Sequence, residues 1–180
     1  MLRMTRTAVT TALVAATMAL VGCPKKSPDG PPPPSAPSPL YEGAAPDFSR
    51  PALSGVQVDT AALRGQTVVI KFFAKYCEPC KRTLPAAEQL HRDHPEVAFI
   101  GISEDESQTD TEALISTYGL TFPVVLDRGN VLAGRFRVSE IPVTFVVDAQ
   151  GIVRWVGGPA QNEDDLARAV ASIAGGNSEG

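Results

Sequence analysis

From residue 67 onward, short apolar runs alternate with segments of helical spacing. Strands are predicted at 67–73, 97–102, 123–127, 143–148 and 152–156, and the turn AQG joins the last two as a hairpin. Helices are predicted from the cysteine pair at 77 and 80 to about residue 93, near 111–118, at 130–136 and from about 162 to 174. Gly119 ends the second helix and Asn130 caps the third. This order implies a layered α/β domain with a mixed sheet.

The first 22 residues have the layout of a secretory signal. Arg3 and Arg6 precede an uncharged run at 7–22, which ends in small residues just before Cys23. That run is shorter than the stretch of about 20 residues that spans a bilayer as a helix. We therefore expect residues 1–22 to be a cleaved signal peptide rather than a permanent anchor.

The tetrad LVGC at 20–23 resembles the lipobox of bacterial lipoproteins, in which the cysteine is acylated and becomes the first mature residue. The resemblance implies a lipidated Cys23 that holds the protein to a membrane through several acyl chains. It also implies a location in the bacterial cell envelope, as a periplasm-facing membrane lipoprotein. An ordinary cleavage site followed by a chance cysteine is the alternative. Cys23 is also the cysteine left over from the pair.

Residues 24–46 carry 9 of the 16 prolines. Such a segment favours extended polyproline II, so residues 23–46 are predicted to be a lipidated cysteine and a disordered linker that reaches up to roughly 70 Å. The folded domain is predicted at 47–174, and residues 175–180 as a flexible tail. The length of the domain at 47–174 suits a hydrophobic core that is stable without a disulfide.

Charge argues against nucleic acid as a partner. The chain has 16 basic and 20 acidic residues, and removal of residues 1–22 takes away two basic and no acidic residues, so the mature net charge is 14 − 20 = −6.

Cys77 and Cys80 allow three interpretations: a structural staple, half of a metal site, or a redox pair. A staple is disfavoured because a disulfide across so short a loop adds little stability. With Cys77 at a helix N-cap, Cys80 falls one turn later on the same face, and Pro79 is tolerated between them. The free N–H groups and the helix dipole favour a thiolate there, so Cys77 is the candidate nucleophile and the more buried Cys80 the resolving thiol.

A metal site is suggested by His91 and His94, which follow the cysteines at a spacing close to a zinc pattern. On one continuous helix, however, His91 would lie about 16 Å along the axis from Cys80. We therefore predict no metal and no cofactor apart from a redox-active Cys77–Cys80 disulfide.

The strand before the pair, Pro85 within the helix and the segment IPVTF at 141–145 carry a wider likeness. Over about residues 45–174 the chain resembles thioredoxin, and more closely the TlpA/ResA-like thiol-disulfide oxidoreductases of the bacterial envelope. The resemblance implies a thioredoxin fold, with a central mixed sheet flanked by helices, an N-terminal extension and a central insertion. It also implies exchange with thiols and disulfides of envelope proteins, and we expect a monomer.

The resemblance also assigns a substrate site. Pro142 would be cis and would face the cysteine pair, which would leave the main chain of Ile141 free to pair with an extended substrate segment. Tyr76 stands where tryptophan is common and would keep an aromatic wall beside Cys77.

Two positions depart from the family. Thr83 stands where the envelope relatives often carry a glutamate, and Lys71 stands where cytosolic thioredoxins carry a buried aspartate. Neither carboxylate is present to assist proton transfer at Cys80. Lys71 either lowers the pKa of a nearby thiol or packs its stem on apolar surface with its ammonium in water.

The direction of electron flow is predicted from Glu78. A carboxylate beside Cys77 opposes a thiolate there, so the Glu78-Pro79 pair favours a reductant that takes electrons from a membrane donor. Lys75 and Lys81 would act in the opposite sense, but we expect both to point into water.

The acidic residues Glu104, Asp105, Glu106 and Asp110 are predicted to form a solvated loop and helix start, with substrate selection as the alternative.

Two competing functions share the fold. A thiol peroxidase normally has threonine or serine three residues before its reactive cysteine, where this chain has Ala74. A noncatalytic binding module would not need the paired cysteines.

Overall fold

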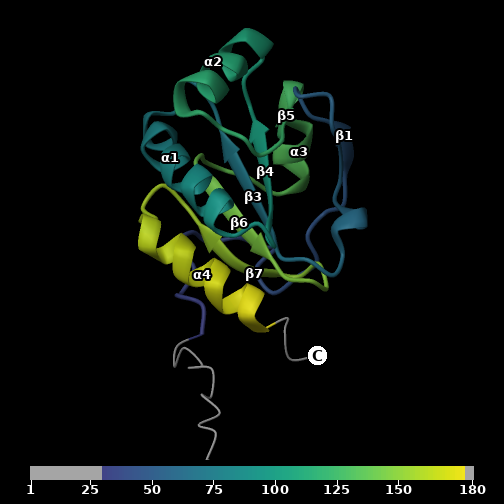
Figure 1. Cartoon of the computed structure of the whole chain (residues 1–180), viewed down its shortest axis with the longest axis vertical. Helices are drawn as coiled ribbons and strands as arrows, with labels where there is room; N and C mark the ends of the chain where they lie inside the picture. The colour runs from purple at the N-terminus through teal and green to yellow at the C-terminus, as the bar shows by residue number, and fades with distance from the viewer. Residues whose placement is uncertain (1–29, 177–180) are drawn as a thin grey trace, which may run out of the picture.

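The computed structural model describes residues 30–176 of the 180-residue chain (Figure 1). The predicted signal peptide and Cys23, and residues 177–180 of the predicted tail, lie outside the described residues. At the centre is a five-stranded sheet in the order β5-β4-β3-β6-β7. Strands β3 (Val68–Phe73), β4 (Ala98–Ser103) and β5 (Val124–Leu126) are parallel, whereas β6 (Val143–Val147) and β7 (Val153–Gly157) add antiparallel pairings. The predicted mixed sheet is confirmed.

Helices cover both faces of this sheet. One face carries α1 (Glu78–Asp93), α2 (Gln108–Tyr118) and α4 (Glu163–Gly176), whose apolar side chains pack in one cluster. The other face carries α3 (Val131–Arg135) and the hairpin of β1 (Ser49–Pro51) and β2 (Gln57–Asp59), with short 3₁₀ turns at η1 (Ala61–Leu63) and η2 (Arg128–Asn130). Figure 1 shows α1 and α4 together on one side of the sheet and α3 with β1 on the other. This is the expected thioredoxin-type arrangement.

The central strand β3 is buried along its whole length. Its side chains alternate between the two layers: Val68, Ile70 and Phe72 face the layer of α3, and Val69 and Phe73 face the layer of α1. Strands with both faces covered are normally apolar throughout. Lys71 is the polar exception in this strand, and alternation places it in the layer of α1.

Each predicted strand and helix is present, and no end differs from the predicted one by more than three residues. Asn130 is the N-cap residue of α3, as predicted, but its side chain makes no capping hydrogen bond. The Asp127 carboxylate does so in its place, because it accepts hydrogen bonds from Leu132 N and Ala133 N, each at 2.9 Å. Asp127 follows β5 directly and brings a negative charge to the helix N-terminus, where the dipole favours it.

The predicted disordered linker is also wrong from residue 30 onward. Residues 30–46 lie along the free edge of β7, where Glu42 N donates to the Val153 carbonyl at 2.8 Å and Ser35 N donates to Val156 at 3.0 Å. Ala36 is buried. An uncovered edge strand presents unpaired backbone groups, and this segment satisfies them. The packed part of the chain therefore includes residues before 47, and α4 extends it to Gly176 instead of 174.

Within residues 30–176, no helix is both long enough and apolar enough to cross a bilayer.

Candidate active site

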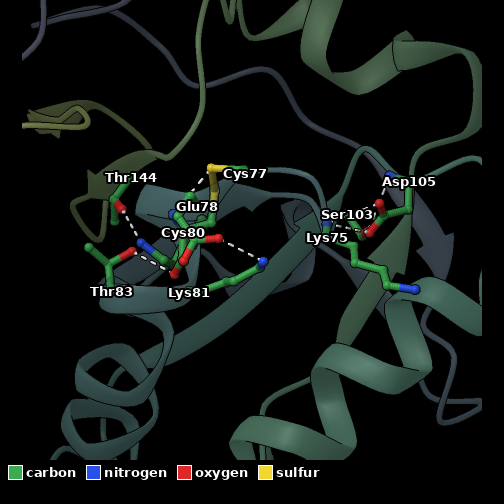
Figure 2. Close-up of a disulfide and its surroundings, with 10 residues drawn as sticks. Lys75, Cys77, Glu78, Cys80, Lys81, Thr83, Ser103, Asp105 and Thr144 are labelled. Atoms are coloured by element: carbon green, nitrogen blue, oxygen red, sulfur yellow. Dashed lines mark hydrogen bonds and ion pairs between the residues drawn. A yellow bond between two sulfur atoms is a disulfide. The ribbon is translucent and has the colours of Figure 1, made fainter.

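Cys77 and Cys80 lie at the start of α1 and are joined by a disulfide (Figure 2). Cys77 is the N-cap, in an extended conformation with φ −88° and ψ 99°, and the two Cα atoms are 5.3 Å apart. A tight turn, closed by the hydrogen bond from Cys77 N to the Ala74 carbonyl at 3.1 Å, precedes the helix. The helix begins after this turn because Pro79 is favourable in a first helical turn. The predicted placement of the pair at a helix N-terminus is confirmed.

The environments of the two sulfurs differ. Cys80 is fully buried, whereas Cys77 retains 6% exposure. The backbone N–H of Cys80 donates to Cys77 Sγ at 3.2 Å. This hydrogen bond and the positive end of the helix dipole would both favour a thiolate at Cys77 in the reduced protein.

The peptide between Ile141 and Pro142 is cis, as the resemblance implied. Pro142 directly precedes β6, whose first residue Val143 pairs with Phe72 near the end of β3. Ile141 packs against the apolar cluster that contains Cys77 and Cys80. Within residues 30–176, no other backbone group is hydrogen-bonded to the Ile141 backbone. The main chain before the cis-proline is therefore available to an extended segment.

Tyr76 is the most exposed large apolar side chain of the site, at 70%. Partial burial, and after it the Glu104 and Asp105 carboxylates, raise the pKa of Tyr76. Burial, and after it the neighbouring Asp127, raise the pKa of the half-buried Glu104. The Tyr76 side chain, directly before Cys77 in the sequence, is thus largely open to solvent.

Asp105 supports the loop that precedes the cysteines. Its buried carboxylate accepts hydrogen bonds from Lys75 N at 3.0 and 3.1 Å and from Ser103 Oγ at 2.9 Å (Figure 2). Ser103 Oγ also lies 2.8 Å from Thr111 Oγ1. The prediction of a solvated acidic loop is therefore wrong for Asp105 and Glu104. The chain turns away from the sheet after β3, so the partly buried Lys75 N–H needs an acceptor that the sheet does not supply.

The charges around Cys77 are paired with one another. Glu78 forms an ion pair with Lys81 at 2.8 Å, and this hydrogen bond lowers the pKa of Glu78 (Figure 2). Lys75 forms an ion pair with Asp110 at 2.5 Å. Both lysines lie at the surface, as predicted, but each pairs with a surface carboxylate, and Lys81 offsets part of the negative charge that Glu78 brings to Cys77.

Lys71 is only 2% exposed, and its Nζ donates a hydrogen bond to Thr144 Oγ1 at 3.2 Å. Burial lowers the pKa of Lys71 from 10.5 to about 7. The interpretation that its ammonium reaches water is therefore wrong. The Thr83 hydroxyl donates to the Cys80 carbonyl at 3.1 Å, so it is tied to the helix backbone.

The two histidines take separate environments. The His91 ring packs against Phe99 and Phe122, with ring centroids 5.3 and 5.8 Å apart, whereas His94 Nδ1 lies 2.9 Å from Glu96 Oε1. Among residues 30–176, no group of three or more His, Cys, Asp or Glu side chains could hold a metal ion.

Fold and site together define the class of this protein: a thioredoxin-type domain with a cysteine pair that can cycle between dithiol and disulfide. Residues 42–156 match the family model of the AhpC/TSA family, and the chain belongs to that family.

Relatives of known class agree with the site. The chain is 32% identical over 120 residues to the thioredoxin-like protein YneN of Bacillus subtilis, an alignment that covers 64% of this chain and 70% of YneN. It is 29% identical over 131 residues to the thiol-disulfide oxidoreductase ResA of Geobacillus kaustophilus, which covers 72% and 75% of the two chains. A solved structure, that of a secreted Mycobacterium tuberculosis disulfide oxidoreductase homologous to DsbE of Escherichia coli, superposes with a TM-score of 0.65 at 28% identity, over 70% of this chain and 96% of that one. This chain is a thiol-disulfide oxidoreductase.

Three residues of the site were not found from the sequence: Ser103, Asp105 and Thr144. In the sequence, Asp105 is one member of an acidic run. Its position just after a predicted strand parallel to the one that leads to the cysteines was the available signal, because such strand ends meet at one edge of a sheet.

Proposed function

We propose that this chain is a membrane-anchored reductase of disulfides in cell-envelope proteins, with Cys77 as nucleophile and Cys80 as resolving thiol. The observation that supports it best is the difference between the two sulfurs. Cys77 is the accessible one and sits on a helix N-terminus, whereas Cys80 is enclosed. A substrate sulfur can approach the first and not the second.

The reaction balances as two thiol–disulfide exchanges. The Cys77 thiolate attacks a substrate disulfide, forms a mixed disulfide and releases the first substrate sulfur as a thiolate. The Cys80 thiolate then attacks Cys77 Sγ, so the Cys77–Cys80 bond forms and the second substrate sulfur leaves. The substrate gains two electrons and two protons, and the protein keeps the disulfide seen in the structure. No cofactor beyond this disulfide is needed.

Ile141, Pro142 and Tyr76 form the proposed docking site. The Ile141 backbone would bind an extended substrate segment by strand addition, and the open face of Tyr76 would pack against it. Tyr76 directly precedes Cys77, and Ile141 packs against the apolar cluster that contains both cysteines, so a bound segment would present its sulfur to Cys77.

A lipid on Cys23 would hold the domain close to the membrane surface. Residues 24–29 separate that cysteine from the packed chain, and a stretch of this length spans at most about 20 Å. This is far less than the roughly 70 Å that a fully extended linker to residue 46 would allow. A donor within or at the membrane could then re-reduce the cysteine pair.

The reducing direction is supported by Glu78, which lies next to Cys77 and opposes a thiolate there. Its ion pair with Lys81 weakens this effect without removing the adjacent charge. We expect a reduction potential nearer that of thioredoxin, about −270 mV, than that of strong oxidants, about −120 mV. Glu78→His should move it towards the oxidants.

Equilibration of the purified chain with a glutathione or dithiothreitol series measures the potential. A wild-type value above about −180 mV, the level of a disulfide isomerase, would overturn the reducing direction. Turnover of a disulfide-containing protein should be lost in Cys77→Ser. Faster turnover of hydrogen peroxide than of disulfides would instead make the protein a thiol peroxidase, and no turnover of either would make it a binding module.

A further inference from the structure

A buried amine shares a layer of the protein with the resolving cysteine. Lys71 is 2% exposed and Cys80 is fully buried. The side chains on either side of Lys71 on the same face of β3, those of Val69 and Phe73, both pack in the cluster that contains Cys80. The Lys71 amine and the Cys80 sulfur therefore lie in the same enclosed layer between β3 and α1.

The strands on both sides of Lys71 provide no charged partner for its ammonium group. Its partner on β6 is Thr144, which accepts the hydrogen bond from Nζ at 3.2 Å. Its partner on β4 is Gly101, which has no side chain, and a Cβ built there would come within about 3 Å of Phe73 and its neighbours. The neighbour in the sheet beyond Thr144 is Gly157. Of the four residues that lie side by side across these strands, Gly101, Lys71, Thr144 and Gly157, only Lys71 is ionisable.

The helices that cover this layer do not supply a counter-charge either. The buried residues of α4 that face the sheet are apolar. The buried carboxylate of α1, Glu88, lies about 12 Å along the helix axis from Cys80 and is held by Thr121 N, Thr121 Oγ1 and Arg92 at 2.6–2.8 Å. Within residues 30–176, no carboxylate forms an ion pair with Lys71.

An unpaired ammonium in such a layer is costly, and the protein can lower the cost by releasing the proton. Burial lowers the pKa of Lys71 to about 7. Near neutral pH the amine can therefore both accept and return a proton, as a general base and acid should.

We propose that Lys71 is the proton partner of Cys80: it takes the thiol proton when Cys80 becomes the attacking thiolate. The inference rests on the proposed roles of Cys77 and Cys80. In the resolving step, a proton passes from Cys80 Sγ to Lys71 Nζ and Cys80 attacks Cys77 Sγ. The bond between Cys77 and the substrate sulfur breaks, that sulfur leaves with the electron pair, and the ammonium of Lys71 returns the proton to it or to solvent.

Stopped-flow reaction of the reduced full chain with a chromogenic aromatic disulfide tests this directly. Attack by Cys77 releases one coloured thiol at a rate proportional to disulfide concentration, and resolution by Cys80 releases the second at a rate independent of concentration. In Lys71→Met the second phase should slow about 100-fold near neutral pH, the usual contribution of a general base, while the first is unchanged. The matched control Lys75→Met removes an exposed positive charge near the same cysteines and should change either phase by less than about threefold.

A spectroscopic readout separates proton exchange from a packing role. In the Cys77→Ser background, thiolate absorbance of Cys80 should rise in two coupled steps with pH when Lys71 is present. With Lys71→Met it should rise in one step, at or above the ordinary thiol pKa of about 8.5. A merely structural lysine would leave a single step in both proteins.

Equal slowing of both phases, or an unchanged second phase with a single titration step in both proteins, would overturn the role of Lys71. Lys71→Gln, which is neutral at every pH and still polar, should slow the second phase as Lys71→Met does, and it decides the question if the methionine variant does not fold. Failure of the proposed function has a different signature, since the first phase would then survive in Cys77→Ser.

Discussion

Lys71→Met should stabilise the oxidised protein, and by an amount that falls as pH rises. The folded-state pKa of Lys71, about 7, is below its unfolded value of 10.5. Between these pH values the unfolded chain binds more protons than the folded protein, so the lysine makes the free energy of unfolding rise with pH. Below about pH 7 both states are protonated and the full cost of the buried charge is present.

The magnitude follows from the shift. Each pKa unit corresponds to about 1.4 kcal/mol, so the 3.5 units between 10.5 and 7 amount to about 5 kcal/mol at low pH. Replacement of a buried charge by an apolar side chain of similar volume is stabilising by about 1–4 kcal/mol in known cases. From about pH 6.5 to pH 9, the advantage of Lys71→Met over wild type should shrink by about 2–3 kcal/mol.

Urea unfolding measures this difference. The single tryptophan, Trp155, is fully buried and reports unfolding by fluorescence. Comparison of the two proteins at each pH cancels the groups that titrate in both, and Lys75→Met serves as the exposed-lysine control with a nearly constant difference. The burial argument would be refuted if the difference in the free energy of unfolding between Lys71→Met and wild type stayed constant within about 0.5 kcal/mol over this pH range.

Three further outcomes are expected. Cys23→Ser should move the protein from the membrane fraction to the soluble envelope fraction, and unchanged membrane retention would contradict lipidation. Pro142→Thr should slow substrate release and accumulate mixed disulfides through Cys77, whereas normal turnover would mean that this proline only precedes β6 and has no role in substrate release. Asp105→Ala leaves the Lys75 N–H without its acceptor, so urea unfolding should show a free energy of unfolding lower by about 1–3 kcal/mol, and turnover should fall as well. Wild-type values for both would mean that the loop before Cys77 does not depend on Asp105.

Local patterns were enough to predict the sheet and the position of the cysteine pair. The apolar run of β3, the turn before Cys77 and the hairpin of β6 and β7 are set by residues close in sequence. The cis-proline and the family followed from the resemblance of those same segments. These features are specified where they occur in the chain.

The missing parts depend on contacts between distant residues. The proline-rich composition at 30–46 gave no sign that the free edge of β7 would bind it. A lysine in an apolar run is compatible with an amine that reaches water, and only coverage of β3 on both faces closes that route. Similarly, Asp105 is buried because Lys75 N, thirty positions earlier in the chain, needs an acceptor.

Trapping with Cys80→Ser tests the central claim most directly. This variant, mixed with a disulfide-containing envelope protein, should accumulate a mixed disulfide that mass spectrometry assigns to Cys77, and Cys77→Ser should accumulate none. The account would be contradicted if Cys77→Ser formed a covalent complex through Cys80 while Cys80→Ser formed none through Cys77.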